Sequence, residues 1–145
     1  MVAVPPERHL VRGRDLADRR YADPELTVAH MAAAAGLSRA HFTREFRRVF
    51  GETPRGYLLT RRMERAAALL RHTDHAVADI CLEVGLRSVG SFTSTFTRHH
   101  GCSPTAYRAA APPAQVYARI PACVVRVHGR PRHRTFGEDS ADAPA

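Results

Sequence analysis

A segment of this chain occurs twice, and this internal repeat limits the folds open to the chain more than any other feature. At a shift of fifty residues, residues 38–57 share eight identical positions with residues 88–107, and six of them carry the predicted cap, core and turn pattern. These six pairs are Ser38 and Ser88, Phe42 and Phe92, Phe46 and Phe96, Gly51 and Gly101, Pro54 and Pro104, and Tyr57 and Tyr107. Before them, Gly36 and Leu37 match Gly85 and Leu86, which leaves Arg87 as one extra turn residue. Two copies are too few to bury the stacked core of a helical solenoid, so the repeat predicts two tandem units.

The first copy, GLSRAHFTREFRRVFGETP, has the spacing of an amphipathic helix. Its apolar side chains recur at i, i+4, i+7 and i+8, which is one face of an α-helix. These side chains are Phe42, Phe46, Val49 and Phe50. Gly36 can adopt the positive φ of a tight turn, Ser38 can cap the following helix, and Gly51 can end it. The pattern predicts the second helix of a helix-turn-helix, with a basic and polar outward face.

The charge of the chain favours a polyanionic partner. All 22 basic residues are arginine and the formal net charge is +8. Residues 1–108 hold 17 arginines and 11 acidic groups, a net +6, so the repeated region carries most of the excess. Such a balance is typical of proteins that bind nucleic acid or an acidic membrane surface, and charge alone does not choose between the two. The 145 residues, 44% of them hydrophobic, suffice for one ordinary core or two small ones.

Cysteine usage and hydropathy predict a cytoplasmic protein. The three cysteines are widely spaced and odd in number, which argues against a disulfide framework and for a reducing compartment. The longest apolar run near the N-terminus, MAAAAGL, is far shorter than a membrane span, and the first ten residues lack the apolar core of a secretion signal. We therefore expect no membrane association.

The order of patterns along the chain predicts about seven helices. We expect an N-terminal tail over residues 1–6, a first module over residues 7–53 and a long linker helix over residues 54–71. A second module follows over residues 72–108, then a C-terminal extension, largely irregular or disordered, over residues 109–145. In the first module, a helix over residues 7–21 precedes a short helix capped by Thr27. Within the extension, residues 123–127 are β-prone.

Metal binding, cofactor binding and catalysis find little support. His72 and His75 are separated by an expected helix break, and His99, His100 and Cys102 lack a second ligand pair at zinc spacing. We expect these histidines to be ordinary surface residues. No nucleophile, histidine and acid arrangement and no glycine-rich phosphate loop stands out. The sequence therefore predicts no metal, no cofactor and no enzyme activity.

Taken together, the residues resemble the double helix-turn-helix DNA-binding domain of AraC/XylS-type transcription regulators. The resemblance covers residues 10–108 and rests on LTVAHMAAAAGLSRAHFTREFRRVFGETPRGYL, RRMERAAALL and VADICLEVGLRSVGSFTSTFTRHHGCSPTAYR. The last segment resembles the most specific signature of the family at Gly85, Phe92, Phe96, Gly101, Pro104, Tyr107 and Arg108. It implies an all-α fold with two tandem helix-turn-helix modules, each a homeodomain-like three-helix unit, joined by a long central helix.

The resemblance also implies roles for individual residues. In such regulators, the third and sixth helices enter successive major-groove segments. By position, the base-reading residues would be Arg39, Ala40, Thr43 and Arg44 in the first module and Gly90, Ser91 and Ser94 in the second. Phosphate contacts would come from Ser38, Arg47, Arg87, Ser88, Thr93 and Arg98. The second set offers only glycine and hydroxyl groups for base reading, which predicts weak sequence discrimination in that half-site.

The function implied is a sequence-specific regulator that binds double-stranded DNA and activates promoters, with RNA polymerase as a candidate second partner. Because only a short tail precedes the first helix, the chain resembles the stand-alone members and is expected to act as a monomer on DNA. Two alternatives remain open at this point. One is a nonspecific architectural DNA-binding protein, and the other is a protein-interaction module whose arginine-rich face binds an acidic partner.

Overall fold

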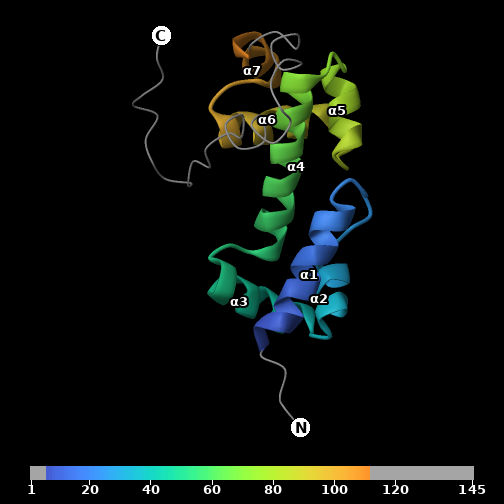
Figure 1. Cartoon of the computed structure of the whole chain (residues 1–145), viewed down its shortest axis with the longest axis vertical. Helices are drawn as coiled ribbons and strands as arrows, with labels where there is room; N and C mark the ends of the chain where they lie inside the picture. Colours follow the sequence, from blue (N-terminus) through green and yellow to red (C-terminus); the bar gives the residue numbers. More distant parts are fainter. Residues whose placement is uncertain (1–5, 112–145) are drawn as a thin grey trace. The chain divides into compact units, whose positions relative to one another are not determined.

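The computed structural model describes residues 6–111, and in this part of the chain all regular secondary structure is α-helical (Figure 1). Its helices are α1 (Pro6–Arg20), α2 (Val28–Ala35), α3 (Arg39–Phe50), α4 (Pro54–His72), α5 (Val77–Glu83), α6 (Val89–His100) and α7 (Pro104–Ala110). The all-α class and the seven helices expected from the sequence are confirmed. The β-prone residues 123–127 and most of the predicted extension lie outside the described residues.

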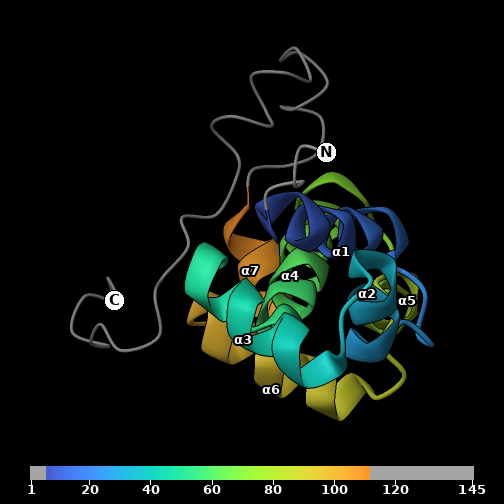
Figure 2. The same ribbon diagram turned by 90° about the horizontal axis from the view of Figure 1, so that it is seen from below.

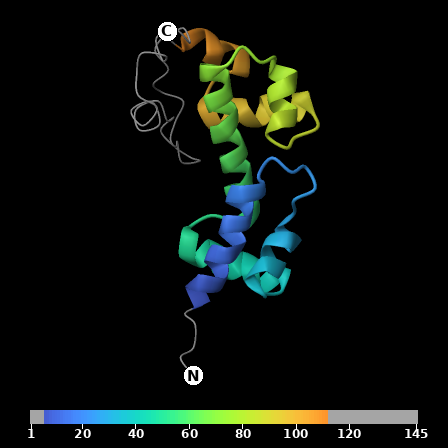
Figure 3. The same ribbon diagram turned by 45° about the vertical axis from the view of Figure 1, so that its right-hand side comes forward.

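The chain divides into two compact units, residues 1–62 and residues 63–145, with the boundary inside α4. In the first unit, α1 packs against both α2 and α3, and α2 packs against α3 (Figures 1 and 3). In the second unit, α6 packs against α5 and α7 (Figure 2). Each unit therefore has a helix-turn-helix supported by further helices.

The core of the first unit follows the apolar faces expected from the sequence. Its fully buried side chains include Leu10, Ala17, Met31, Phe42 and Phe46. Val28, at the start of α2, is only half-buried.

A glycine in the middle of α1 lets that helix approach the core closely. An ideal Cβ built at Gly13 would lie 2.6 Å from two ring carbons of Phe42 and 2.9 Å from the carbonyl oxygen of Met31. Any side chain here would collide with the core, so the glycine sets the distance between α1 and the other two helices.

The turn between α2 and α3 is built by local hydrogen bonds. Gly36 adopts a φ of 69°, which an L-residue with a side chain rarely takes, and its N–H donates to carbonyls of α2. The Oγ of Ser38 then accepts from the backbone N–H of His41, 3.2 Å away. Both features are as the sequence predicts, and together they fix where α3 begins.

The internal repeat is visible in the packing of the two units. Residues 41–50 and residues 91–100 have the same order of buried, half-buried and exposed positions. In each unit a tyrosine from the following helix meets the second phenylalanine edge-on, Tyr57 on Phe46 at 5.7 Å and Tyr107 on Phe96 at 5.3 Å between ring centroids. The repeated sequence thus encodes a repeated core.

Candidate nucleic-acid interface

The outward face of α3 gathers the residues that the sequence assigned to base reading. Arg39, Ala40 and Arg44 are exposed, and Thr43 is half-buried. The hydroxyl of Thr43 donates to the carbonyl oxygen of Arg39 at 2.8 Å, so this residue would meet a base edge through its lone pairs or its methyl group. The first turn of α3 and the residues one turn later therefore form one exposed surface.

The positive charge of this face is not neutralised within α3. The helix has one acidic side chain, Glu45, whose Oε2 accepts from Nε and Nη2 of Arg48 at 2.9 and 2.8 Å. The hydrogen bonds from Arg48 lower the pKa of Glu45, which keeps it ionised and paired. Within residues 6–111, no salt bridge is formed by Arg39, Arg44 or Arg47. These three guanidinium groups are available to an anionic partner.

The corresponding face of α6 is exposed but has small side chains. Gly90, Ser91 and Ser94 are all exposed. The Oγ of Ser88 accepts from the backbone N–H of Ser91 at 3.3 Å, so Ser88 caps this helix as Ser38 caps α3. This surface offers hydroxyl groups and backbone, and no long side chain that could reach a base edge from these positions.

The residues assigned to phosphate contacts lie around the exposed faces of α3 and α6. Exposed positions are held by Ser38, Arg47, Arg87, Ser88 and Arg98, while Thr93 is half-buried. Nη2 of Arg98 lies 3.5 Å from Oγ1 of Thr95, a contact at the limit of hydrogen bonding. The Arg98 side chain, held only by this contact, can turn toward a partner at little cost.

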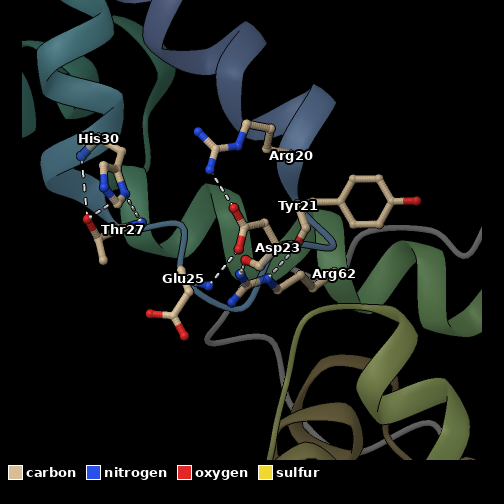
Figure 4. Close-up of polar contacts among 7 residues, drawn as sticks. All are labelled: Arg20, Tyr21, Asp23, Glu25, Thr27, His30 and Arg62. Carbon is tan, nitrogen blue, oxygen red and sulfur yellow. Dashed lines mark hydrogen bonds and ion pairs between the residues drawn. The ribbon is translucent and has the colours of Figure 1, made fainter.

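An arginine that sequence reasoning missed holds the loop leading into α2. Arg62, on α4, is only 8% exposed, and it donates from Nε to the carbonyl of Tyr21 at 2.8 Å and from Nη2 to the carbonyl of Asp23 at 2.9 Å (Figure 4). The side chain of Asp23 is bound separately by Arg20. The planar guanidinium thus fixes two points of the loop before the helix-turn-helix, two residues apart.

Arg108 performs the same task in the second unit. It donates from Nε to the carbonyl of Leu70 at 3.2 Å, and from Nη2 to the carbonyls of Thr73 at 3.2 Å and His75 at 2.6 Å. These carbonyls belong to the end of α4 and to the loop before α5. The family signature pointed to Arg108, but nothing in the spacing of arginines distinguished Arg62 from the exposed ones.

Among the residues that the structure describes, no helix is long and apolar enough to cross a membrane. In the same region, no group of three or more histidine, cysteine, aspartate or glutamate side chains is arranged to hold a metal ion.

A double helix-turn-helix with an exposed basic face on α3 is typical of one class of DNA-binding domain, and comparison with known proteins identifies it. The family model described as a helix-turn-helix domain, of the AraC type, matches residues 31–110. The chain belongs to the AraC family of DNA-binding transcription regulators, which is a non-enzymatic family.

The similarity extends to individual proteins. Over 86 residues the chain is 34% identical to the transcriptional regulator MtrA of Neisseria gonorrhoeae, which covers 59% of this chain and 29% of that regulator. It is 34% identical to the DNA-binding domain of AdpA, solved in complex with a target DNA, with a TM-score of 0.66 over 78% of this chain and 96% of that domain. An AraC-type regulator from Chromobacterium violaceum is 30% identical, with a TM-score of 0.65 over 71% of this chain and 91% of the other. The chain spans less than a third of the first curated relatives it matches.

Proposed function

We propose that this chain binds double-stranded DNA sequence-specifically, with α3 and α6 as its reading helices in successive major-groove segments. The observation that carries the proposal is the exposed face of α3, where arginines without salt bridges stand at the start of a capped helix. An α-helix fits the major groove, and arginine supplies the donors that guanine accepts there. The likeness to a domain solved on its target DNA supports the same reading.

Within this face we assign the main base contact to Arg44, assisted by Arg39, Ala40 and Thr43. A guanidinium can bind O6 and N7 of guanine together, which is worth about 1–3 kcal/mol of discrimination against other bases. Ser38 and Arg47 would contact phosphates on either side, because a capped helix N-terminus and a basic side chain both favour anions. This module would supply most of the sequence information.

The second module would contribute chiefly to affinity, through contacts to DNA phosphates. Gly90, Ser91 and Ser94 would approach the bases closely but offer little discrimination. Phosphate contacts from Arg87, Ser88, Thr93 and Arg98 would orient the chain without specifying bases. We keep the module boundaries proposed from the sequence, 7–53 and 72–108, with residues 54–71 as the linker between them.

The outcome of binding that we propose is promoter activation, with RNA polymerase as the further partner and the bacterial cytoplasm as the compartment. Matched relatives include the lactose operon transcription activator of Staphylococcus xylosus and the activator RclR of Escherichia coli. Because one chain carries two reading helices, it can engage two groove segments without a second copy. We therefore propose a monomer on DNA.

Selection from a randomised duplex pool, followed by affinity measurements across a salt series, tests this function. We expect one half-site with strong base preference and one with weak preference. Arg44→Ala should abolish preference at one base pair and leave the other positions unchanged. A nonspecific architectural protein would instead bind every duplex equally at each salt concentration, and a protein-interaction module would bind none.

A further inference from the structure

A pocket of about 450 Å³ lies in the first unit, and of its lining residues only Arg39 has been assigned a DNA contact so far. Its wall is formed by the start of α2, at Thr27, Val28 and Ala29, and by three arginines from α3 and α4. These arginines are Arg39, Arg55 and Arg62. No aspartate or glutamate is among the lining residues. Three cations and no anion around one cavity indicate a site for a negatively charged group.

The three arginines occupy different depths. Arg62 is the buried one, and its hydrogen bonds go to the neutral carbonyls of Tyr21 and Asp23, so its charge is not cancelled by a salt bridge in the described part of the chain. Arg39 and Arg55 are exposed, and the structure likewise gives neither of them a salt bridge within residues 6–111. The buried guanidinium of Arg62 is fixed, and the exposed side chains of Arg39 and Arg55 can move. Together they can surround an anion in the pocket.

The start of α2 adds backbone donors. Thr27 caps this helix by accepting from the backbone N–H of His30, while the ring Nδ1 of His30 accepts from the backbone N–H of Thr27 at 3.1 Å (Figure 4). The amides of Val28 and Ala29, in the first turn, have no partner inside the helix. They contribute donors and the positive end of the helix dipole to the pocket that the arginines already make positive.

The rest of the wall is apolar, and it indicates which anion fits. Leu26 and Leu58 line the pocket beside the charged groups. A backbone phosphate of DNA carries a deoxyribose on each side, which can contact such side chains. Arg39 belongs both to this pocket and to the proposed reading face of α3, so the DNA that α3 reads would bring its own phosphate here.

We propose that this pocket holds one phosphate of the DNA backbone adjoining the base pairs read by α3, with Arg55 as its principal side-chain donor. The inference rests on the proposed function and deepens it. The amides at the start of α2 donate to the same phosphate, and Arg62 acts as a positioning residue that holds the loop before α2. Binding here fixes the angle at which α3 enters the groove, because the two helices share one turn.

The experiment is a scan with duplexes that carry a single neutral methylphosphonate, moved one phosphate at a time along the selected site. It uses the full chain, the variant Arg55→Gln, and Arg12→Gln as a charge-matched control. Arg12 is an exposed arginine of α1 that does not line the pocket. Since Arg55 is exposed, we expect circular dichroism melting curves of all three proteins to agree.

In the unsubstituted protein, one methylphosphonate beside the first half-site should weaken binding about tenfold, as expected for loss of a charge-assisted hydrogen bond. Arg55→Gln should weaken binding to every duplex that lacks this methylphosphonate by a similar factor and flatten the log–log salt slope by about 0.9. The penalty of that one methylphosphonate should then disappear in Arg55→Gln and persist in Arg12→Gln.

An unchanged methylphosphonate profile in Arg55→Gln, with base preference intact, would overturn the pocket as a phosphate site and leave the proposed function standing. A chain that shows no base preference on any duplex would overturn the proposed function itself. The two failures are therefore distinguishable.

Discussion

Each helix-turn-helix unit has its own core, and the two cores have matching phenylalanines and tyrosines. The exposed surfaces of the two units differ. At a shift of fifty residues the buried phenylalanines of α3 and α6 are identical, and the caps Ser38 and Ser88 are too. At four outward positions the second unit has a different, uncharged residue, and at three of these it replaces an arginine. The pairs are Arg39 and Val89, Ala40 and Gly90, Arg44 and Ser94, and Arg47 and Thr97. Packing constrains one face of each helix and leaves the other free to diverge in function.

The aromatic clusters of the two cores differ at one position. In the first unit, the ring centroids of Phe50 and Phe46 are 4.5 Å apart. The guanidinium carbon of Arg14 lies 5.0 Å from the ring centroid of Phe50. The second unit has His100 at the equivalent place, 4.3 Å from Phe96 and 5.3 Å from Tyr107. Its Nε2 is buried without a hydrogen-bond partner. A titratable ring thus replaces a hydrocarbon ring in otherwise matched surroundings.

The two arginines that hold the inter-helix loops have the same role at positions that are not equivalent in the repeat. Arg62 and Arg108 do the same work, yet they are not equivalent in the repeat, since a shift of fifty places Arg108 opposite Leu58. Leu58 precedes Arg62 by one helical turn. Each unit therefore satisfies the carbonyls of its loop with a guanidinium, but from a different turn of the supporting helix.

The largest effect should come from removing these guanidinium groups. We expect Arg62→Met and Arg108→Met each to lower the free energy of unfolding by about 3 kcal/mol, because several carbonyls lose charge-assisted partners. Lysine should not rescue either position, since an ammonium lacks the planar fork. Chemical denaturation followed by circular dichroism measures the loss.

The matched control is Arg65→Met, which changes an exposed arginine of α4 and should stay within about 0.5 kcal/mol of the parent. Equal stability of Arg62→Met and Arg65→Met would show that the loop before α2 does not depend on its arginine.

The second prediction uses one substitution with opposite signs in the two units. Gly13→Ala should destabilise the first unit by about 2 kcal/mol, because overpacking against Phe42 exceeds the gain in helix propensity. Gly90→Ala should stabilise the second by about 0.5 kcal/mol, since a Cβ there meets only Ser88 Oγ at 4.0 Å. Thermal unfolding compares them. If both changes were stabilising, α1 would not pack as closely as the structure shows.

Much of the fold could be predicted from sequence because its signals are local. The helix period, the capping serines and the glycine in the α2–α3 turn each act within a few residues, and the structure confirms them. Thr27 was also predicted as a cap, although the contribution of His30 to that cap was not. The repeat strengthened the prediction of helices, caps and turns, since most of these signals appear in both copies.

What could not be predicted depends on contacts between distant segments. We expected His100 to be an ordinary surface residue, which was wrong: it is half-buried against two aromatic rings. Nothing in the sequence distinguishes Arg62 from the other arginines of its helix, or marks Gly13 as a point of close helix packing. The pocket around Arg55 exists only because three helices meet there. No local pattern distinguishes such residues, and the roles of the reading faces stay predictions.

The contrast between Phe50 and His100 leads to a pH-dependent prediction. Burial lowers the pKa of His100 from 6.5 to about 4, with His99 and Arg71 acting in the same direction and Glu64 and the Met63 carbonyl opposing. The unfolded chain therefore binds the proton more tightly than the folded chain, so stability falls as the pH falls from 6.5 toward about 4. His100→Phe should remove this loss and add about 1.5 kcal/mol at about pH 5, allowing for partial exposure.

Urea denaturation of both proteins at about pH 7 and about pH 5 measures this difference. The advantage of His100→Phe should grow as the pH decreases. A constant advantage would mean that the Phe96 and Tyr107 contacts, rather than the proton, account for it.

We expect the smallest effect from a substitution that gives the second unit the base-reading arginine proposed for the first. Ser94 is the counterpart of Arg44 and is exposed on α6, so Ser94→Arg should create a base preference in the second half-site. We expect about 1 kcal/mol, at the low end of a bidentate contact, because no neighbouring side chain is arranged to orient the new guanidinium. Ser94→Lys is the control, since it adds equal charge without the planar fork and should raise affinity for all duplexes alike. If both variants gained affinity without base preference, the difference between the units would lie in how deeply α6 enters the groove and not in its side chains.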